Sequence, residues 1–143
     1  IFMLYQIRMR LFPDFILMVL LPIFLIVELI VLFIGLKLVK AEERNSFKFV
    51  VVSFIIQILT LFFINSPFIF MGLTGAFNNG GPDPLIIILF IMLSIFIDIN
   101  IINAIHKIGL KRALFVFLLM LIPIFIFGGL IGYLVSMANM MTQ

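Results

Sequence analysis

The chain has 143 residues, of which 66% are hydrophobic and only 10% are charged, and its mean hydropathy is +1.45. Soluble domains carry about 25% charged residues, and a domain of this size still exposes much of its chain to solvent, so the composition excludes a soluble fold. We expect one membrane-embedded domain over residues 1–143. The net charge of +3 comes from basic residues clustered between apolar runs, a pattern that suits control of membrane topology better than nucleic-acid binding.

The residue types also limit the chemistry. The absence of cysteine excludes disulfides and thiolate metal sites. The single histidine, His106, cannot build a multi-histidine metal or haem site within the chain, and we predict no metal and no cofactor. The first residue is Ile1, so residues 1–10 could be the end of a longer segment or of a processed leader.

Four segments are long and apolar enough to cross the hydrocarbon core as helices, which takes about 20 residues. In chain order they are predicted at about 13–39, 47–73, 85–105 and 113–137. The predicted fold class is therefore an all-α integral membrane protein, whose four transmembrane helices are arranged as two hairpins.

The connections between these segments carry helix-start and turn signals. In the first connection, Asn45 or Ser46 could cap the second helix. The second connection, GAFNNGGPDP, has the chemistry of a turn, and Asp83 or Pro84 would open the third helix well. The third connection breaks at Gly109.

The charges of the connections predict how the chain is oriented in a cell membrane. Lys and Arg gather in the connections at 40–46 and 106–112, whereas 74–84 contains neither. Basic loops stay in the cytoplasm, so we expect the first and third connections to be cytoplasmic, and 74–84 and both termini to lie outside. Arg8 and Arg10 conflict with this orientation because they precede the first helix on its predicted outer side.

The second and fourth helices begin in a similar way. A basic turn is followed by SFK at 46–48 in one hairpin and by GLK at 109–111 in the other, and an apolar helix comes next. This pattern, in NSFKFVVVSF and KIGLKRALFVFLL, resembles that of small prokaryotic Yip1-like multi-span membrane proteins. The resemblance implies a related architecture only; that family usually has five spans, whereas four are predicted here.

Three of the four helices carry a polar residue at a similar depth. Glu28, Gln57 and Asp98 each lie nine residues from the lysine that flanks their helix on the predicted cytoplasmic side, which is roughly 13 Å along a helix. Pro123 lies near this depth on the fourth helix. An exposed carboxylate there would cost about 2.5 to 3.5 kcal/mol, so we expect Glu28 and Asp98 to point inward, in an intramembrane polar layer with Gln57.

Two roles remain open for this layer. Glu28 and Asp98 could be relay or coordination groups for protons or cations, since intramembrane carboxylates often mark such routes, and two close carboxyls could share a proton. Alternatively, Glu28, Gln57 and Asp98 form hydrogen bonds that hold the helices of this chain or of a neighbouring subunit together. The packing role is favoured, because a relay usually needs polar groups toward both surfaces.

Other residues are candidates for contact with a neighbouring helix or a partner chain: Ser94, Asn100, Asn103, Gly128 and Gly132. The three polar ones lie on two faces of the third helix by helical spacing, which suggests one internal and one external neighbour. The two glycines form a GxxxG pattern that permits close helix approach, and ordinary close packing is favoured over a dedicated dimer face.

Pro67 and Pro123 lie inside predicted helices, and both are expected to kink them. The fragment INSPF at 64–68 could instead break the second helix and leave carbonyl groups to bind an ion, as the discontinuous helices of transporters do. A kink near the outer interface is favoured.

The chain is predicted not to be an enzyme, because no loop pairs a nucleophile with a base and no glycine-rich phosphate loop follows a strand. The favoured hypothesis is a small non-catalytic membrane subunit that packs against partner helices in a larger membrane complex. Its predicted partners are the lipid bilayer and either other membrane subunits or a second copy of the chain. The alternative is a compact channel, or a proton- or cation-coupled transporter, that uses Glu28 and Asp98.

Overall fold

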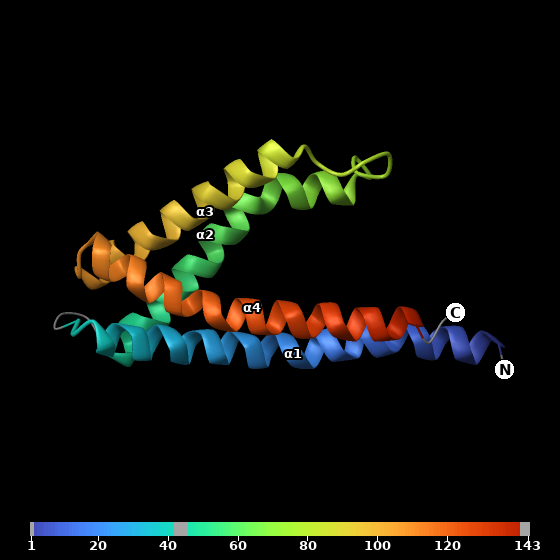
Figure 1. The fold of residues 1–143 in the computed structure, drawn as a ribbon, viewed down its shortest axis with the longest axis horizontal. Coiled ribbons are helices and arrows are strands. Elements are labelled where there is room, and N and C mark those ends of the chain that lie inside the picture. The colour runs from blue at the N-terminus through green and yellow to red at the C-terminus, as the bar shows by residue number, and fades with distance from the viewer. Residues whose placement is uncertain (1, 42–45, 141–143) are drawn as a thin grey trace.

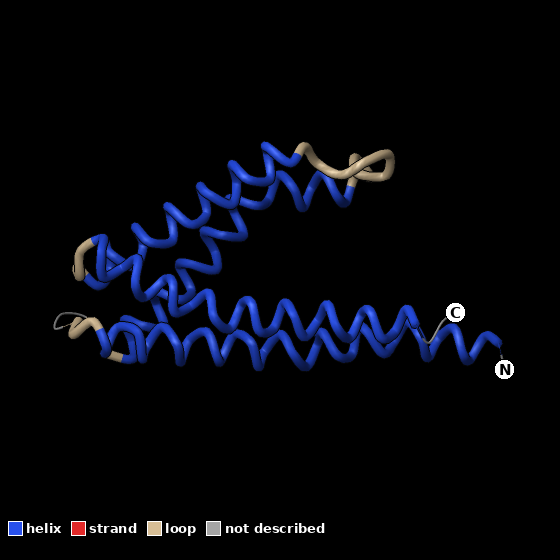
Figure 2. Tube along the Cα trace, viewed as in Figure 1, coloured by secondary structure: helices blue, strands red, loops and turns tan. Residues whose placement is uncertain are grey.

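The computed structural model describes residues 2–41 and 46–140, and the side chains of residues 15–41, 46–137 and 140. Its helices are α1 (Phe2–Leu38), α2 (Phe47–Leu73), α3 (Pro84–His106) and α4 (Leu110–Met140). The described residues contain no strand (Figure 2). Each helix is long and apolar enough to cross a membrane. The chain is thus a four-span helical membrane protein, and the predicted fold class is confirmed.

The first helix is longer than its apolar segment. The sequence predicts its start near residue 13, but α1 begins at Phe2, because the preceding residues are mostly good helix formers such as Leu, Met, Gln and Arg. The apolar span within α1 is Phe15–Leu38. A helix of 37 residues is roughly 55 Å long, whereas the hydrocarbon core is about 30 Å thick, so the first part of α1 extends beyond the span.

The start of α3 follows the predicted chemistry. Asp83 is the N-cap, and its side-chain oxygen accepts a hydrogen bond from the Leu85 N–H at 2.8 Å, while Pro84 is the first helical residue. Ser46 is the N-cap of α2 but makes no side-chain cap hydrogen bond. Asn45, the alternative cap, lies outside the described residues.

In the connections that follow α1 and α3, a lysine has the left-handed backbone conformation. Lys40 has φ of 53° and Lys107 has φ of 50°, a region that is unusual for residues other than glycine. After α3, the side-chain oxygen of Asn103 accepts a hydrogen bond from the Gly109 N–H at 2.8 Å. Asn103, predicted as a helix or partner contact, thereby closes the turn into α4.

The helices form a ring in which each packs against two others. α1 contacts α2 and α4, and α3 also contacts α2 and α4. The most extensive contact joins α1 to α4, which are farthest apart in the sequence, and the least extensive joins α1 to α2, which the sequence pairs as a hairpin. In the described part of the chain α1 and α3 do not pack directly, so they are diagonal to each other.

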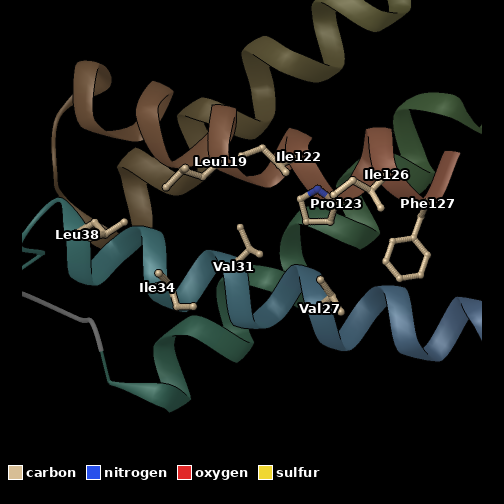
Figure 3. Close-up of a pocket in the computed structure, with 9 residues that line it drawn as sticks. All are labelled: Val27, Val31, Ile34, Leu38, Leu119, Ile122, Pro123, Ile126 and Phe127. Carbon is tan, nitrogen blue, oxygen red and sulfur yellow. The ribbon is translucent and has the colours of Figure 1, made fainter. Parts of the chain in front are cut away.

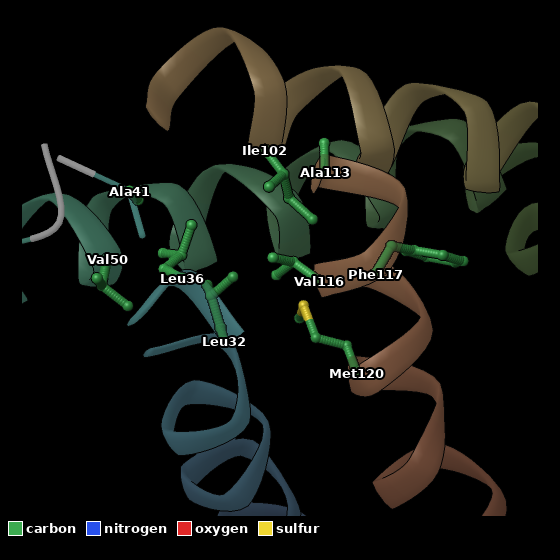
Figure 4. Close-up of a cluster of buried hydrophobic side chains, with 9 residues drawn as sticks. All are labelled: Leu32, Leu36, Ala41, Val50, Ile102, Ala113, Val116, Phe117 and Met120. Atoms are coloured by element: carbon green, nitrogen blue, oxygen red, sulfur yellow. The ribbon is translucent and has the colours of Figure 1, made fainter. Parts of the chain in front are cut away.

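This ring is closed at one end only. The α1–α4 pair and the α2–α3 pair meet where the two short connections lie, and they diverge toward the chain termini and the α2–α3 connection (Figure 1). We call the first the basic end, after the Lys and Arg residues of its connections, and the second the open end. The apolar core lies near the basic end (Figure 4). Its members are Leu32, Leu36, Ala41, Val50, Ile102, Ala113, Val116, Phe117 and Met120.

Candidate functional site

Each helix turns one stripe of residues toward the centre of the ring. Leu36, Leu32 and Glu28 are four residues apart on α1, and all three are buried; residues with this spacing lie on one helix face. The other stripes are Val50, Ser53 and Gln57 on α2, His106, Ile102 and Asp98 on α3, and Ala113, Val116, Phe117 and Met120 on α4. On α1, α2 and α3, the residue of the stripe farthest from the basic end is polar: these are Glu28, Gln57 and Asp98.

The three polar residues lie at one level. Each is eight to ten residues from the end of its helix at the basic end, or about 12 to 15 Å, and their exposed fractions are 4% for Glu28, 2% for Gln57 and 5% for Asp98. The inward orientation expected for these residues is therefore present in the structure.

Glu28 and Asp98 are buried on the two helices that lie diagonally in the ring. These helices, α1 and α3, do not pack directly in the described residues. Both carboxylate oxygens of Glu28 and the Oδ1 atom of Asp98 are buried without a hydrogen-bond partner among the described residues. Burying an ionised carboxylate in this way is very costly unless a proton or a cation neutralises it.

The amide nitrogen of Gln57 bonds within its own helix. Its Nε2 atom donates a hydrogen bond to Ser53 Oγ, one turn back on α2, at 3.0 Å. Ser53 is fully buried and was not singled out from the sequence, although a serine four residues before a buried glutamine is a detectable signal. The polar layer thus consists of an acid pair and a separate Ser53–Gln57 pair on α2.

An apolar layer separates the acid pair from the basic end. Leu32 and Ile102 follow Glu28 and Asp98 by one turn on α1 and α3, and both are fully buried. Val116 and Phe117 of α4 belong to the same core (Figure 4). Among the described residues of α1, α3 and α4, the buried side chains between the acid pair and His106 are all apolar, so no buried polar route along those helices joins the carboxyl groups to the basic end in this conformation.

His106 is a further buried polar residue, on the other side of the apolar layer. It lies eight residues after Asp98 on the same face of α3 and is 1% exposed. The sequence alone does not indicate that His106 is buried; it indicates only that a single histidine cannot build a multi-histidine metal site. The described residues contain no group of three or more His, Cys, Asp or Glu side chains that could hold a metal ion.

The polar contact candidates on α3 have different surroundings. Ser94 lies opposite α2, where its hydroxyl oxygen is 3.5 Å from the side-chain nitrogen of Asn65, which also donates to the Leu61 carbonyl at 2.8 Å. Asn100 donates to the Phe96 carbonyl of its own helix at 2.7 Å. Ser94 is thus an internal helix contact, whereas contact of Asn100 with a partner chain stays a prediction.

The glycines of α4 do not mediate close packing within the chain. A Cβ atom added at Gly128 or Gly132 would meet no heavy atom of a neighbouring helix within 4 Å. Close approach occurs instead at Gly35 of α1, where an added Cβ would lie 3.2 Å from Val116 Cγ1 of α4. Contact of Gly128 and Gly132 with a partner helix stays a prediction, and Gly35 is the small residue that the sequence analysis missed.

Both prolines lie inside continuous helices. Pro67 lacks the N–H that would bond the Phe63 carbonyl, and the Ser66 hydroxyl donates to that carbonyl at 2.7 Å instead. The carbonyl is therefore satisfied within α2, which does not favour an ion site at INSPF. Pro123 is buried on α4 at the depth of the acid pair.

The arrangement has few chemical options. Two buried carboxyl groups on diagonal helices can take up and release a proton, or they can accept the positive charge of a small cation or of a partner's side chain. The chain was compared with known proteins, and no protein family, curated protein or solved structure matched it. The resemblance to Yip1-like proteins therefore stays a prediction. The chain is an integral membrane protein with four helical spans.

Proposed function

We propose that this chain is a compact proton-coupled carrier or proton path, in which Glu28 and Asp98 together bind the proton. The observation that supports this proposal is the burial of both Glu28 carboxylate oxygens and of Asp98 Oδ1 without hydrogen-bond partners among the described residues. A side chain that served only to join helices would form interhelical hydrogen bonds at this depth. None is formed by the Glu28 carboxylate oxygens within those residues.

A proton is the cation that fits the site best. An unpaired carboxylate inside a span is costly, and a second carboxylate nearby adds repulsion between like charges. A metal cation needs several oxygen ligands and space for them, about six for Mg²⁺ or Ca²⁺, whereas a proton needs neither. One proton bound by Glu28 or Asp98 would remove one buried charge and the repulsion between the two carboxylates.

The apolar layer gives the proposed path a closed side. Leu32 and Ile102 lie between the acid pair and the basic end, so release in that direction requires α1 and α3 to move apart there. Toward the open end the two helix pairs diverge (Figure 1). We infer that the acid pair exchanges its proton with the basic end only after the apolar layer separates.

Proton flux into liposomes tests the proposal. The purified chain is reconstituted around a pH-sensitive dye, and a potassium diffusion potential is applied to drive protons inward. We expect flux above that of protein-free vesicles, and we expect Glu28→Gln and Asp98→Asn each to reduce it to that background. Asn100→Ala is the control, because Asn100 lies on the same helix as Asp98 and its side chain donates to the Phe96 carbonyl of that helix.

Two results would count against a proton carrier. One is wild-type flux equal to that of protein-free vesicles. The other is unchanged flux in both carboxyl variants, provided that circular dichroism shows the same helix content as in the wild type.

A second candidate is the small non-catalytic subunit of a membrane complex. Its support is the incomplete ring: the α1–α4 pair and the α2–α3 pair meet only toward the basic end (Figure 1), and Gly128, Gly129 and Gly132 leave one part of α4 open. A partner helix could pack closely there. In this role the acid pair could be protonated, or a positively charged side chain of the partner could neutralise it.

Chemical crosslinking in native membranes tests the subunit role. If it is correct, the chain is recovered in a crosslinked band larger than the monomer, and Gly128→Leu weakens that band while Leu118→Phe, on another exposed part of α4, does not. Recovery of the chain solely as a dispersed monomer under the same conditions would exclude it.

A further inference from the structure

A second feature of the fold lies outside the ring, on the surface of the α1–α4 pair. A groove of about 360 Å³ runs between these two helices and is open to the surroundings. Figure 3 shows side chains of both helices bordering it. Its lining is entirely apolar: Val27, Val31, Ile34, Leu38, Leu119, Ile122, Pro123, Ile126 and Phe127.

The groove follows one stripe on each helix and leads to the basic end. On α1 it ends at Leu38, the last residue of the helix. On α4, Arg112 precedes Leu119 and Ile126 by seven and fourteen residues, so it lies on the same helix face, about two turns before the first α4 residue of the groove lining. Arg112 is exposed, and no acidic residue occupies the first turn of α4.

The surroundings of this end are strongly basic. Residues 37–48 and 107–112 contain seven Lys and Arg residues but only two Glu and no Asp. A planar guanidinium binds phosphate oxygens in a bidentate manner, and basic residues beside transmembrane helices attract anionic lipids. An apolar groove with a cationic end is complementary to one molecule of a bilayer, a lipid with apolar chains and an anionic phosphate headgroup.

We propose that the α1–α4 groove is a binding site for an anionic phospholipid. One acyl chain lies along the apolar lining between Leu38 and Val27, and the phosphate contacts Arg112, with Lys37 and Lys40 supplying further positive charge at the same end. This site is separate from the acid pair, so it does not depend on the proposed proton chemistry.

Native mass spectrometry tests the lipid site. The purified chain is incubated in mixed micelles with equal amounts of phosphatidylglycerol and phosphatidylcholine that carry the same acyl chains, and the retained lipids are counted. We expect retained phosphatidylglycerol to exceed phosphatidylcholine. Arg112→Gln should lower this preference roughly fivefold, the effect of one basic residue at a lipid headgroup. Lys48→Gln removes the same charge at the same end but from α2, and it should leave the preference nearly unchanged.

A second pair of variants tests the groove itself. Ile34→Trp fills the groove and should reduce retention of both lipids, whereas Ile55→Trp, at an equally exposed position of 49% on α2, should not. Equal retention of the two lipids by the wild type would overturn the proposal. So would equal effects of Arg112→Gln and Lys48→Gln, which would indicate unspecific attraction to the basic end, or unchanged retention in a folded Ile34→Trp variant.

Discussion

At the scale of single residues, Glu28 is the most informative side chain in the chain. It is 4% exposed, and neither of its carboxylate oxygens has a hydrogen-bond partner among the described residues. Folding therefore gains nothing obvious from the carboxyl group, since a buried polar group without partners destabilises the folded state. A residue that costs stability at its position is better explained by a role in binding than by a role in packing.

The burial of Glu28 without hydrogen-bond partners among the described residues predicts the effect of an apolar replacement. Glu28→Met keeps a similar volume and removes the buried carboxyl, so the free energy of unfolding in detergent should stay equal or rise by about 1 to 4 kcal/mol, as for other buried charges replaced by apolar residues. Thermal or denaturant unfolding, followed by circular dichroism, measures it. Ile26→Met, at an exposed position of the same helix, is the control. A loss of about 3 to 5 kcal/mol would instead indicate that Glu28 is part of a stabilising pair.

At the scale of helices, the contact between α1 and α4 holds the ends of the chain together. Close approach at Gly35 brings α1 against Val116 of α4, and farther from the basic end Phe24 and Phe127 meet edge to face with ring centroids 5.2 Å apart. A membrane has no hydrophobic effect to drive helices together, so van der Waals packing at small residues contributes much of their association. Gly35 is thus expected to be more important than the GxxxG glycines for the fold of the monomer.

Substitution by leucine at two glycines tests this difference. Gly35→Leu forces a side chain into Val116 and should lower the free energy of unfolding by about 1 to 3 kcal/mol, as overpacking does elsewhere. Gly129→Leu, where an added Cβ meets no atom of another helix within 4 Å, should not. Both are measured on the purified monomer in detergent. Equal stability of the two variants would show that α1 and α4 are not in close contact at Gly35.

At the scale of the whole molecule, the fold puts both basic connections at one end. The connections after α1 and α3 lie together there, while the α2–α3 connection and the termini lie toward the other end (Figure 1). Four antiparallel spans require this alternation whichever way the protein is inserted. The basic residues predict the direction of insertion, with the basic end on the cytoplasmic side.

The absence of cysteine makes this orientation directly measurable. Asn79→Cys lies in the α2–α3 connection and Lys111→Cys at the start of α4, and both positions are exposed. A membrane-impermeant maleimide should label Asn79→Cys in intact cells and Lys111→Cys only after permeabilisation, with the wild-type chain as the unlabelled control. The reverse result would mean that the basic end faces outward.

Much of this architecture was predictable from local sequence. A helix in lipid must satisfy its own backbone hydrogen bonds, so length and apolarity alone predict four helices, and the start of α3 at Asp83 and Pro84 follows from capping chemistry. The inward orientation of Glu28 and Asp98 was predictable for the same reason, because a carboxylate is costly in lipid. The start of α1 at Phe2 was not predicted, because apolarity marks only the span, whereas good helix formers before Pro13 extend the helix toward the N-terminus.

The neighbours of these residues depended on tertiary structure. The sequence by itself determined the spans and which side chains avoid lipid, since both depend on the transfer of single segments and residues from water to hydrocarbon. Only the folded chain decided that α1 packs most extensively on α4, that Glu28 and Asp98 lie on diagonal helices, and that Gly35 rather than Gly128 is a point of close approach. Lipid is equally apolar around every helix, so pairing depends on shape complementarity between distant segments, which hydropathy does not encode.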